Sequence, residues 1–301
     1  MVAMNDLRVY IVGAAGQLGR ALAATRPAAV EAVPLTSAEI DVTDPLSVAS
    51  ALAGVRAGDV VINAAAYTDV DAAETEVAAA TAVNTAGPGN LARITAVAGA
   101  RLVHVSTDYV FTPEPGRDRP FEPGEVAADA QPATVYGATK LAGERLASAV
   151  DPDAVIVRTA WVFTGSPGAG DFVATMRRLE AERETISVVD DQLGSPTYAP
   201  DLAAGLWELA GLAPAHYPAG AVLHATGGGQ GTWFDLARAV FAGLGADPQR
   251  VQPCTTADFP RPAPRPAYSV LSGASWAAAG LTPLRDWHEA VAAALADAGV
   301  G

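Results

Sequence analysis

A tyrosine and a lysine four residues apart have the clearest capacity for chemistry in this sequence. Lys140 is the only lysine among 301 residues, against eighteen arginines, and it follows Tyr136 in the segment Tyr-Gly-Ala-Thr-Lys. An ammonium is a compact charge and a guanidinium a broad planar fork, so the two are not interchangeable. The i, i+4 spacing places both side chains on one helix face, where the cation can lower the phenol's pKa. We therefore expect Tyr136 to exchange a proton with a carbonyl oxygen; the ordinary alternative is a surface lysine on an amphipathic helix.

A glycine-rich turn near the N-terminus is the second candidate. Arg8–Val12 is typical of a strand, and it runs into Gly13-Ala-Ala-Gly16-Gln-Leu-Gly19 before a helical stretch. Glycines there allow a tight turn, close approach of a pyrophosphate to backbone amides, and close packing of helix on sheet. At the first strand-to-helix crossover of an α/β chain, this motif predicts a dinucleotide site rather than a merely structural turn.

Cofactor choice depends on the end of the second predicted strand, Ala32–Leu35. A site that prefers NAD usually carries an acid there, and this chain has Thr36. With no carboxylate expected to repel a 2′-phosphate, the sequence favours NADPH, although NADH is possible. Asp41 and Val42 follow shortly and could reach the adenine, but Asp41 could equally cap the turn before Pro45.

The fourth predicted strand, Arg101–Ser106, ends in Thr107 and Asp108. Ligands of open α/β sheets bind beyond the carboxyl ends of the strands, so the Thr107 hydroxyl is placed to donate to a substrate oxygen. Alone, this segment could be a simple strand-end turn. The order of glycine turn, Thr107, Tyr136 and Lys140 along the chain favours a reaction centre.

Short apolar strands alternate with helical stretches in the first half, which predicts a Rossmann-type doubly wound parallel sheet in an α/β protein. We expect strands at Arg8–Val12, Ala32–Leu35, Asp59–Ala64, Arg101–Ser106 and Ala154–Arg158, and helices at Leu18–Ala24, Pro45–Leu52, Ala78–Ala98 and Val135–Ala149. Regularity weakens after Trp161. The sequence predicts an NAD(P)-binding domain over 1–160 and a smaller, mainly substrate-binding α/β domain over 161–301, with segments near 185–205 and 221–226 able to rejoin the sheet.

Composition excludes several classes of function. The net charge of −14 argues against a nucleic-acid partner, which requires a basic face. No apolar run approaches the ~18 residues of a membrane span, and Met1–Asp6 lacks the pattern of a secretion signal. The lone Cys254 excludes an intramolecular disulfide, so we expect a cytoplasmic protein. The four histidines lack ligand spacing, so we predict no metal site; they are His104, His216, His224 and His288.

Six segments spread over nearly the whole chain carry a more specific pattern. They are Ala64-Ala-Ala-Tyr-Thr-Asp-Val-Asp-Ala-Ala-Glu74, Val105-Ser-Thr-Asp-Tyr-Val-Phe111, Arg158-Thr-Ala-Trp-Val-Phe163, Asp171-Phe-Val-Ala-Thr-Met176, Asp190-Asp-Gln-Leu-Gly-Ser-Pro-Thr197 and Phe259-Pro-Arg-Pro-Ala-Pro-Arg265. Together they resemble the dTDP-4-dehydrorhamnose reductase family of the extended short-chain dehydrogenase/reductase superfamily. The last four lie in the half of the chain where superfamily members diverge.

The resemblance implies hydride transfer from NADPH to C4 of dTDP-4-dehydro-6-deoxy-L-mannose (dTDP-4-dehydrorhamnose), which gives dTDP-L-rhamnose for cell-surface polysaccharide. It implies that Tyr136 protonates the nascent alkoxide, Lys140 lowers the Tyr136 pKa and holds the nicotinamide ribose, and Thr107 bonds the sugar oxygen. A positioned acid and donor suit the negative charge that hydride attack builds on oxygen. The resemblance assigns to the cofactor Gly16, Gln17, Leu18, Thr36, Asp41, Val42, Ala66, Tyr67, Thr68 and Val105.

Fewer residues are assigned to the sugar nucleotide than to the cofactor. The resemblance assigns Asp108 and Trp161 to it, although Trp161 could be an ordinary core aromatic. Arg261 and Arg265 could meet the diphosphate, because an anionic substrate must find cations on this acidic chain.

Some questions stay open. Some relatives bridge a dimer with Mg²⁺ through a carboxylate after the glycine motif, but this chain has Arg20-Ala-Leu22, so a magnesium-linked dimer is doubtful and the protein could be a monomer or a homodimer. A sugar-nucleotide epimerase or dehydratase would share the fold, but Tyr109 replaces the second carboxylate of dehydratases. A non-catalytic NADP-binding subunit, like the regulatory subunit of methionine adenosyltransferase, is a further alternative.

Overall fold

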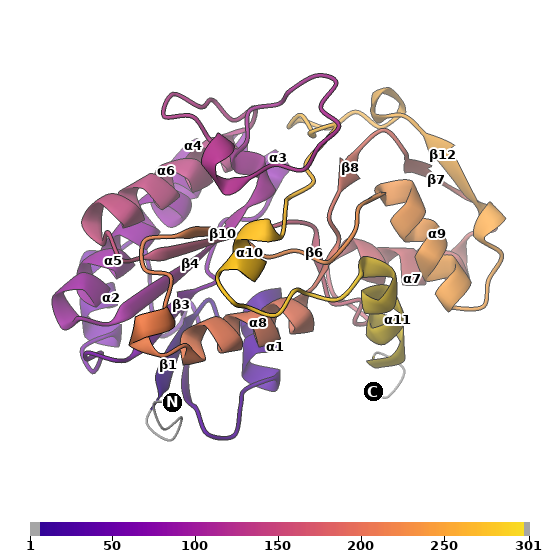
Figure 1. The fold of residues 1–301 in the computed structure, drawn as a ribbon. Helices are drawn as coiled ribbons and strands as arrows, with labels where there is room; N and C mark the ends of the chain where they lie inside the picture. Colours follow the sequence, from indigo (N-terminus) through magenta and orange to yellow (C-terminus); the bar gives the residue numbers. More distant parts are fainter. Residues whose placement is uncertain (1–6, 298–301) are drawn as a thin grey trace.

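The computed structural model describes residues 7–297, and its larger part is built on a six-stranded parallel sheet (Figure 1). The strand order is β10-β5-β4-β3-β1-β2. The bounds are β1 Arg8–Val12, β2 Glu31–Leu35, β3 Val60–Asn63, β4 Arg101–Thr107, β5 Val155–Thr159 and β10 Val222–His224. The first five begin and end within one residue of the predicted strands. The doubly wound α/β class is confirmed.

Helices cover both faces of this sheet. Helices α1 and α8 pack together on one face, and α2, α5 and α6 cover the other. The bounds are α1 Gln17–Ala24, α2 Pro45–Ala51, α5 Gly87–Ala98, α6 Val135–Val150 and α8 Ala199–Gly211. The indole of Trp207 in α8 donates to the carbonyl oxygen of Leu22 in α1 at 3.2 Å. A helix from the second half of the chain therefore belongs to the layers around the sheet.

The helix expected over Ala78–Ala98 is wrong as a single element. It divides into α4 (Val77–Thr81), a π-helical turn (Ala82–Ala86) and α5. The π turn carries Asn84, whose side chain accepts from Tyr67 N at 2.8 Å and donates to Tyr67 O at 3.1 Å. Periodicity alone does not reveal such a local widening of a helix. Through Asn84, the π turn connects the loop after β3, which carries Tyr67, to the helical layer.

A smaller part with its own core lies beside the sheet, at the right of Figure 1. Its elements are α7 (Phe172–Glu182), α9 (Trp233–Gly243), α11 (Trp287–Asp297), the parallel pair β7 (Ile186–Val189) and β12 (Val251–Cys254), and the short strands β6 (Val162–Phe163), β8 (Leu193–Gly194), β9 (Thr197–Tyr198) and β11 (Gly231–Thr232). Strand β7 pairs with β12 rather than with the large sheet, whereas β10 pairs with β5. The division into two domains stays a prediction.

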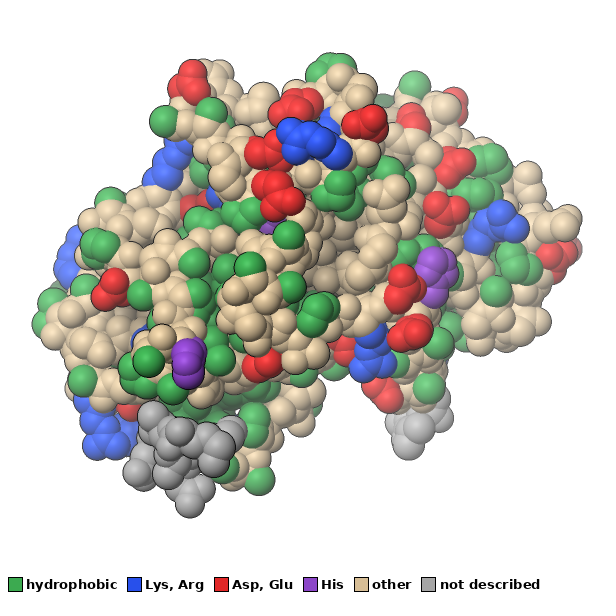
Figure 2. Space-filling view, viewed as in Figure 1, with side chains coloured by type: hydrophobic (Ala, Val, Ile, Leu, Met, Phe, Trp, Pro, Cys, Tyr) green, Lys and Arg blue, Asp and Glu red, His purple; other side chains and the backbone are tan. Residues whose placement is uncertain are grey.

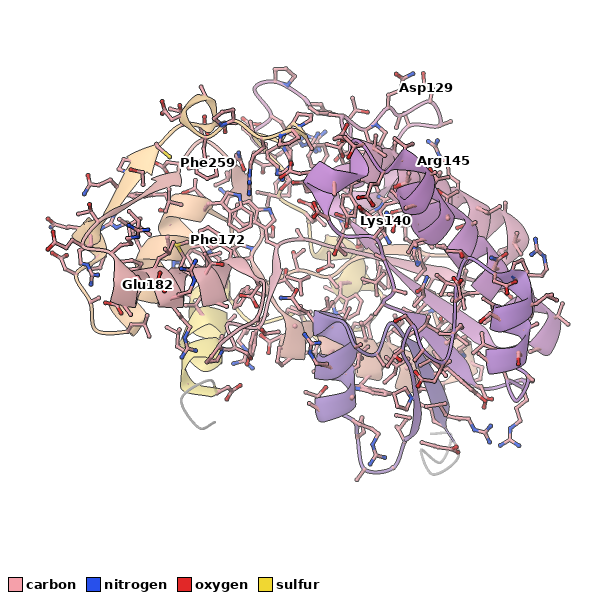
Figure 3. All side chains as sticks on the ribbon, turned by 180° about the vertical axis from the view of Figure 1, so that it is seen from behind. Asp129, Lys140, Arg145, Phe172, Glu182 and Phe259 are labelled. Carbon is pink, nitrogen blue, oxygen red and sulfur yellow. The ribbon has the colours of Figure 1, made fainter. Side chains whose placement is uncertain are left out.

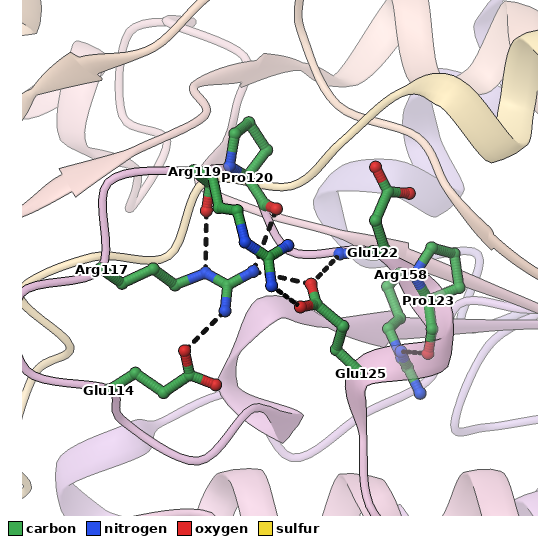
Figure 4. A network of polar contacts seen from close by, with 8 residues as sticks. All are labelled: Glu114, Arg117, Arg119, Pro120, Glu122, Pro123, Glu125 and Arg158. Carbon is green, nitrogen blue, oxygen red and sulfur yellow. Dashed lines mark hydrogen bonds and ion pairs between the residues drawn. The ribbon is translucent and has the colours of Figure 1, made fainter.

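An ion-pair network fixes the loop after β4 (Figure 4). Arg117 lies between Glu114 and Glu125, with N–O distances of 2.6 Å to each. Its guanidinium also lies 3.6 Å from the centre of the Phe121 ring, and Phe121 stacks on Phe111. Because Phe111 closes the 3-10 turn Asp108–Val110, this network steadies the strand-end turn.

Acidic side chains outnumber basic ones on the face shown in Figure 2, in keeping with the net charge of −14. Among residues 7–297, no helix combines the length and the apolar character needed to cross a membrane. The first six residues, on which the expected lack of a secretion signal depends, lie outside the described range.

Candidate active site

A cleft of about 1010 Å³ opens at the carboxyl ends of β1, β3, β4 and β5. This is where a doubly wound sheet binds its ligands. The predicted residues that line it are Gly13, Gly16, Gln17, Leu18, Thr36, Asp41, Val42, Ala66, Thr68, Val105, Thr107, Asp108, Tyr136, Lys140 and Trp161. Four others do not line it; they are Gly19, Tyr67, Arg261 and Arg265.

The glycine turn has the geometry of a phosphate cradle. Gly13 has a φ of +85°, and a Cβ added to it would lie 2.6 Å from Ala65 N. A Cβ on Gly19 would collide with the carbonyl oxygen of Gly13, so Gly19 serves helix packing. Gly16 begins α1 without a side-chain cap, and Gln17 and Leu18 of its first turn line the cleft. A helix N-terminus of this kind suits a pyrophosphate.

A carboxylate stands at the end of β2, contrary to expectation. Glu39 accepts hydrogen bonds from Thr36 N at 2.8 Å and from the Thr36 hydroxyl. These bonds lower the pKa of Glu39 and keep it charged. Glu39 comes three residues after Thr36, and a turn brings its carboxylate back to the strand end. The residue type at position 36 alone therefore could not predict this carboxylate. Asp41 accepts from Thr43 N at 2.9 Å, as a turn-capping acid does, and it also lines the cleft.

Tyr136 lies in the first turn of α6, which Thr134 caps by accepting from Gly137 N at 3.0 Å. Its ring meets Tyr109 edge-on, with centroids 5.4 Å apart. Burial raises the pKa of Tyr136 to about 12, although the nearby Thr107 hydroxyl acts in the opposite direction. The lowered pKa expected for this phenol is therefore absent from the free protein.

Lys140 is buried beneath α6 and points toward the sheet (Figure 3). Its Nζ donates to the carbonyl oxygen of Val105 at 2.7 Å and lies 3.4 Å from His104 Nε2. Burial lowers the Lys140 pKa to about 8, against the opposing effect of Glu144. Lys140 is thus not the surface lysine of the ordinary alternative. His104 was not expected here, although a histidine inside an apolar strand is a signal of a buried polar contact.

Thr107 and Asp108 form a polar turn at the end of β4. The Thr107 hydroxyl donates to Asp108 Oδ1 at 3.0 Å and accepts from Tyr109 N at 3.3 Å. Asp108 Oδ2 is buried and has no hydrogen-bond partner among residues 7–297. Burial raises the pKa of Asp108 to about 6. Buried polar atoms normally have partners, so this oxygen is available to a ligand.

Thr159 is a further hydroxyl at this place that the sequence did not identify. It pairs in register with Thr107 across β4 and β5, so the two side chains lie on the same face of the sheet. Thr159 lines the cleft, and its Oγ1 is buried without a hydrogen-bond partner in the described part of the chain. The end of a second strand therefore adds a free polar group to the site.

Trp161 lies in the wall of the cleft and stacks on Trp233. The ring centroids are 3.5 Å apart and the planes differ by 4°. Trp161 has a φ of +48°, and it is the one non-glycine residue of the described chain with a positive φ. A Cβ at Gly194 would collide with its ring. Trp161 thus lines the cleft and also packs, partly buried, against the core. No local signal could have revealed Trp233 as its partner.

Arg261 and Arg265 meet on Asp71 of helix α3 (Val70–Ala73). Arg265 Nη2 lies 3.0 Å from Asp71 Oδ2, and Arg261 Nε lies 3.7 Å from the same oxygen. Arg265 lines a separate cavity of about 50 Å³, which shares Asp108 and Tyr109 with the wall of the cleft. The two arginines are thus brought together beside the reaction centre, although they do not line the main cleft.

Among residues 7–297, no group of three or more His, Cys, Asp or Glu side chains is arranged to hold a metal ion. After the glycine motif, the Arg20 guanidinium donates to the carbonyl oxygen of Ala15.

Known proteins resemble this chain throughout its length. The family model described as RmlD substrate binding domain matches residues 7–300. The dTDP-4-dehydrorhamnose reductases of Mycobacterium tuberculosis H37Rv and Mycolicibacterium smegmatis are 54% and 51% identical, with 96% of this chain and 92% and 85% of theirs covered. A crystal structure of the Bacillus anthracis dTDP-4-dehydrorhamnose reductase in complex with NADP has a TM-score of 0.87 at 33% identity, covering 96% of this chain and 99% of that one. This protein belongs to the dTDP-4-dehydrorhamnose reductase family.

Proposed function

We propose that this protein reduces the C4 ketone of dTDP-4-dehydro-6-deoxy-L-mannose with NADPH and so forms dTDP-L-rhamnose. The observation that carries the proposal is the gathering of the glycine turn, Thr107, Tyr136 and Lys140 along one cleft. The names of the close relatives support the substrate, and the NADP of the Bacillus anthracis structure supports the cofactor. NADH is the alternative hydride donor.

The cleft fits a dinucleotide. Gly13 leaves room where a side chain would strike Ala65, and the first turn of α1 faces the same space. In the proposal, Gly16, Gln17 and Leu18 hold the pyrophosphate. The remaining residues assigned to the cofactor are Gly13, Gly19, Thr36, Asp41, Val42, Ala66, Tyr67, Thr68, Val105, Tyr136 and Lys140. The bound nicotinamide supplies a hydride.

Side chains of this protein supply the proton that the C4 oxygen needs. Reduction of a ketone places negative charge on its oxygen, which needs a donor positioned before the charge develops. The Tyr136 hydroxyl gives its proton to the C4 oxygen, and the Thr107 hydroxyl donates a hydrogen bond to the same oxygen. Because the buried phenol has a pKa of about 12 in the free protein, it is protonated at neutral pH and ready to act as an acid. In its charged form, Lys140 stabilises the phenolate that remains.

The sugar nucleotide is held by a second set of groups. Asp108, with a buried oxygen that lacks a partner, suits a sugar hydroxyl. Trp161 offers an aromatic face in the cleft wall. Arg261 and Arg265 supply the positive charge for the diphosphate, for which a planar guanidinium is well shaped.

The proposal places the protein in the cytoplasm, because its single cysteine, Cys254, is a free thiol that suits a reducing compartment. It includes no magnesium-bridged dimer. Sedimentation of the purified protein with and without Mg²⁺ decides between a monomer and a homodimer.

A turnover assay tests the proposed function. The purified chain is given dTDP-4-dehydrorhamnose with NADPH or with NADH, and the loss of reduced nicotinamide is followed together with the appearance of dTDP-L-rhamnose. We expect turnover with NADPH. Nicotinamide binding without turnover of either cofactor would point to a non-catalytic binding protein and would overturn the proposal.

A further inference from the structure

Three buried polar side chains from three different elements form a chain under α6. Asn63 ends β3, His104 lies in β4, and Lys140 lies in α6. Asn63 Nδ2 lies 3.0 Å from His104 Nδ1, and His104 Nε2 lies 3.4 Å from Lys140 Nζ. All three residues are at most 1% exposed. Buried polar groups of this kind must satisfy one another, so their donors and acceptors can be counted.

The orientation of the Asn63 amide is fixed by the backbone. Asn63 Oδ1 accepts from the main-chain N–H of Ala65 at 3.1 Å. A backbone N–H is always a donor, so the oxygen of the amide must face it. The amide nitrogen is then left to face His104 Nδ1, and an amide nitrogen can only donate.

The orientation of the amide decides the tautomer of the imidazole. Burial and the nearby Lys140 lower the pKa of His104 well below its usual value, so the ring is neutral. A neutral imidazole has one N–H and one bare nitrogen. Because Nδ1 must accept from Asn63, the hydrogen is on Nε2, which faces Lys140.

An Nε2–H and an ammonium are both donors and cannot bond each other. A neutral amine can accept from Nε2–H with its lone pair and still donate to the Val105 carbonyl oxygen, 2.7 Å away. We propose that His104 is a positioning residue whose Nε2–H, fixed by Asn63, destabilises the ammonium of Lys140 in the free protein. Lys140 is thereby held ready to gain or lose a proton instead of carrying a permanent charge.

Other charged and titratable groups lie on α6 and on the segments packed around it. On α6 itself are Tyr136 and Glu144, and Glu144 is paired with Arg158 of β5 at 2.7 Å. The turn after β4 contains Asp108 and Tyr109, and Glu74, which follows α3, accepts from Val135 N at 2.9 Å. Among these groups, Glu144 favours the ammonium, so it acts against the effect assigned to His104.

This inference rests on the proposed function, in which Lys140 acts beside Tyr136, and it adds how the charge of Lys140 is controlled. The expected consequence is that Lys140 holds its proton more tightly when ligands draw it toward the reaction centre. The tautomer of His104 and the charge of Lys140 can both be measured in the free protein without turnover. A failure of the inference is therefore distinguishable from a failure of the proposed function.

The first test reads the tautomer directly. The full chain is labelled with ¹⁵N-histidine, and long-range ¹H–¹⁵N correlation spectra separate protonated from bare ring nitrogens. Single substitutions of His216, His224 and His288 assign the remaining ring to His104. We expect His104 to carry its hydrogen on Nε2 and to stay neutral through the physiological range. A hydrogen on Nδ1, or on both nitrogens, overturns the inference. This measurement needs no substitution of His104 itself.

The second test reads Lys140, which is the only lysine in the chain and gives a single resonance when lysine is labelled with ¹³C at Cε. We expect the Lys140 pKa that this resonance reports to be about 8, and a midpoint at the ordinary ~10.4 overturns the inference. Because burial also lowers the Lys140 pKa, the contribution of His104 is read from the response of Lys140 to Asn63→Asp. Asn63→Asp offers a carboxylate to His104 Nδ1, which should move the hydrogen to Nδ1 and turn Nε2 into an acceptor for the ammonium. The proton affinity of Lys140 should then rise roughly tenfold.

Asn84→Asp is the matched control, because Asn84 bonds Thr139, next to Lys140, and makes no hydrogen bond to His104. It adds the same charge near α6 and should leave the His104 tautomer unchanged, with a smaller effect on Lys140. If Asn63→Asp raises the proton affinity of Lys140 without moving the hydrogen to Nδ1, charge alone acts and the inference fails. A moved hydrogen without any rise at Lys140 also contradicts it.

Discussion

Asp71 and Arg265 are separated by 194 positions in the sequence, yet Asp71 Oδ2 and Arg265 Nη2 lie 3.0 Å apart. Asp71 also accepts from Ala263 N at 3.1 Å, so one carboxylate holds the segment that carries Arg265 against α3. Three residues further along the chain, Glu74 accepts from the backbone of α6 next to Tyr136. The segment 69–75 therefore links the arginines to the helix of the proposed catalytic acid.

Asp71→Asn should weaken binding of the sugar nucleotide while leaving the chemical step largely intact. The pair is partly exposed, so its loss is worth about 1 kcal/mol, or roughly a fivefold rise in KM for the sugar nucleotide. Steady-state kinetics measure this. Glu182→Gln, which breaks an exposed pair with Arg178 on α7, is the control and should change neither constant. A fall in kcat with unchanged KM would assign Asp71 to the chemistry instead.

Glu39→Gln should shift cofactor preference toward NADPH. The ionised Glu39 carboxylate lies on Thr36, where a 2′-phosphate would be bound, and like charges repel. Glutamine keeps an acceptor for Thr36 N but removes the charge. We expect the ratio of kcat/KM for NADPH to that for NADH to rise about tenfold. An unchanged ratio would mean that the 2′-phosphate lies away from Thr36.

Thr159→Val should lower kcat/KM for the sugar nucleotide roughly tenfold, because a ligand hydroxyl would lose a partner in a buried place. Thr159→Ser keeps the hydroxyl and should retain most of the activity. NADPH affinity, followed by nicotinamide fluorescence, should not change in either variant. The valine variant should also be at least as stable, because the free protein gives Thr159 Oγ1 no hydrogen bond to lose. If Thr159→Val binds NADPH more weakly instead, the hydroxyl serves the cofactor.

Asp108 makes stability depend on pH. Its folded-state pKa of about 6 is raised above the ordinary 3.8, so the folded protein binds this proton more tightly than the unfolded chain. The contribution is present below about pH 4 and is lost as pH rises through 6. Asp108→Asn cannot ionise and should be more stable than the parent above pH 6, by roughly 2–3 kcal/mol, with the advantage vanishing near pH 4. Urea unfolding at the two pH values measures this; an equal difference at both would exclude ionisation as the cause.

The sequence predicted those elements that short stretches of residues determine. The strands β1 to β5 are apolar runs bounded by turn residues, and the glycine turn follows β1 directly, so their places could be read from the chain. The open end of a parallel sheet then placed Thr107 and Tyr136 in one cleft.

Partners that meet only in the folded chain could not be predicted in this way. Trp233 stacks on Trp161 from a helix 72 positions away, and Arg265 finds Asp71 from across the sequence. The Tyr136 pKa was expected to fall because a cation lies one turn away. The Tyr136 pKa rises because burial disfavours the phenolate, and Lys140 Nζ donates to the carbonyl oxygen of Val105 in β4.

Tyr136→Phe tests the central claim most directly, because it removes one hydroxyl and keeps the ring that contacts Tyr109. The variant should bind NADPH with unchanged affinity and should reduce dTDP-4-dehydrorhamnose about 10²- to 10⁴-fold more slowly, as the loss of a positioned general acid requires. Single-turnover reduction under saturating NADPH measures the chemical step. A rate equal to that of the parent protein would contradict the account and assign the proton to another group.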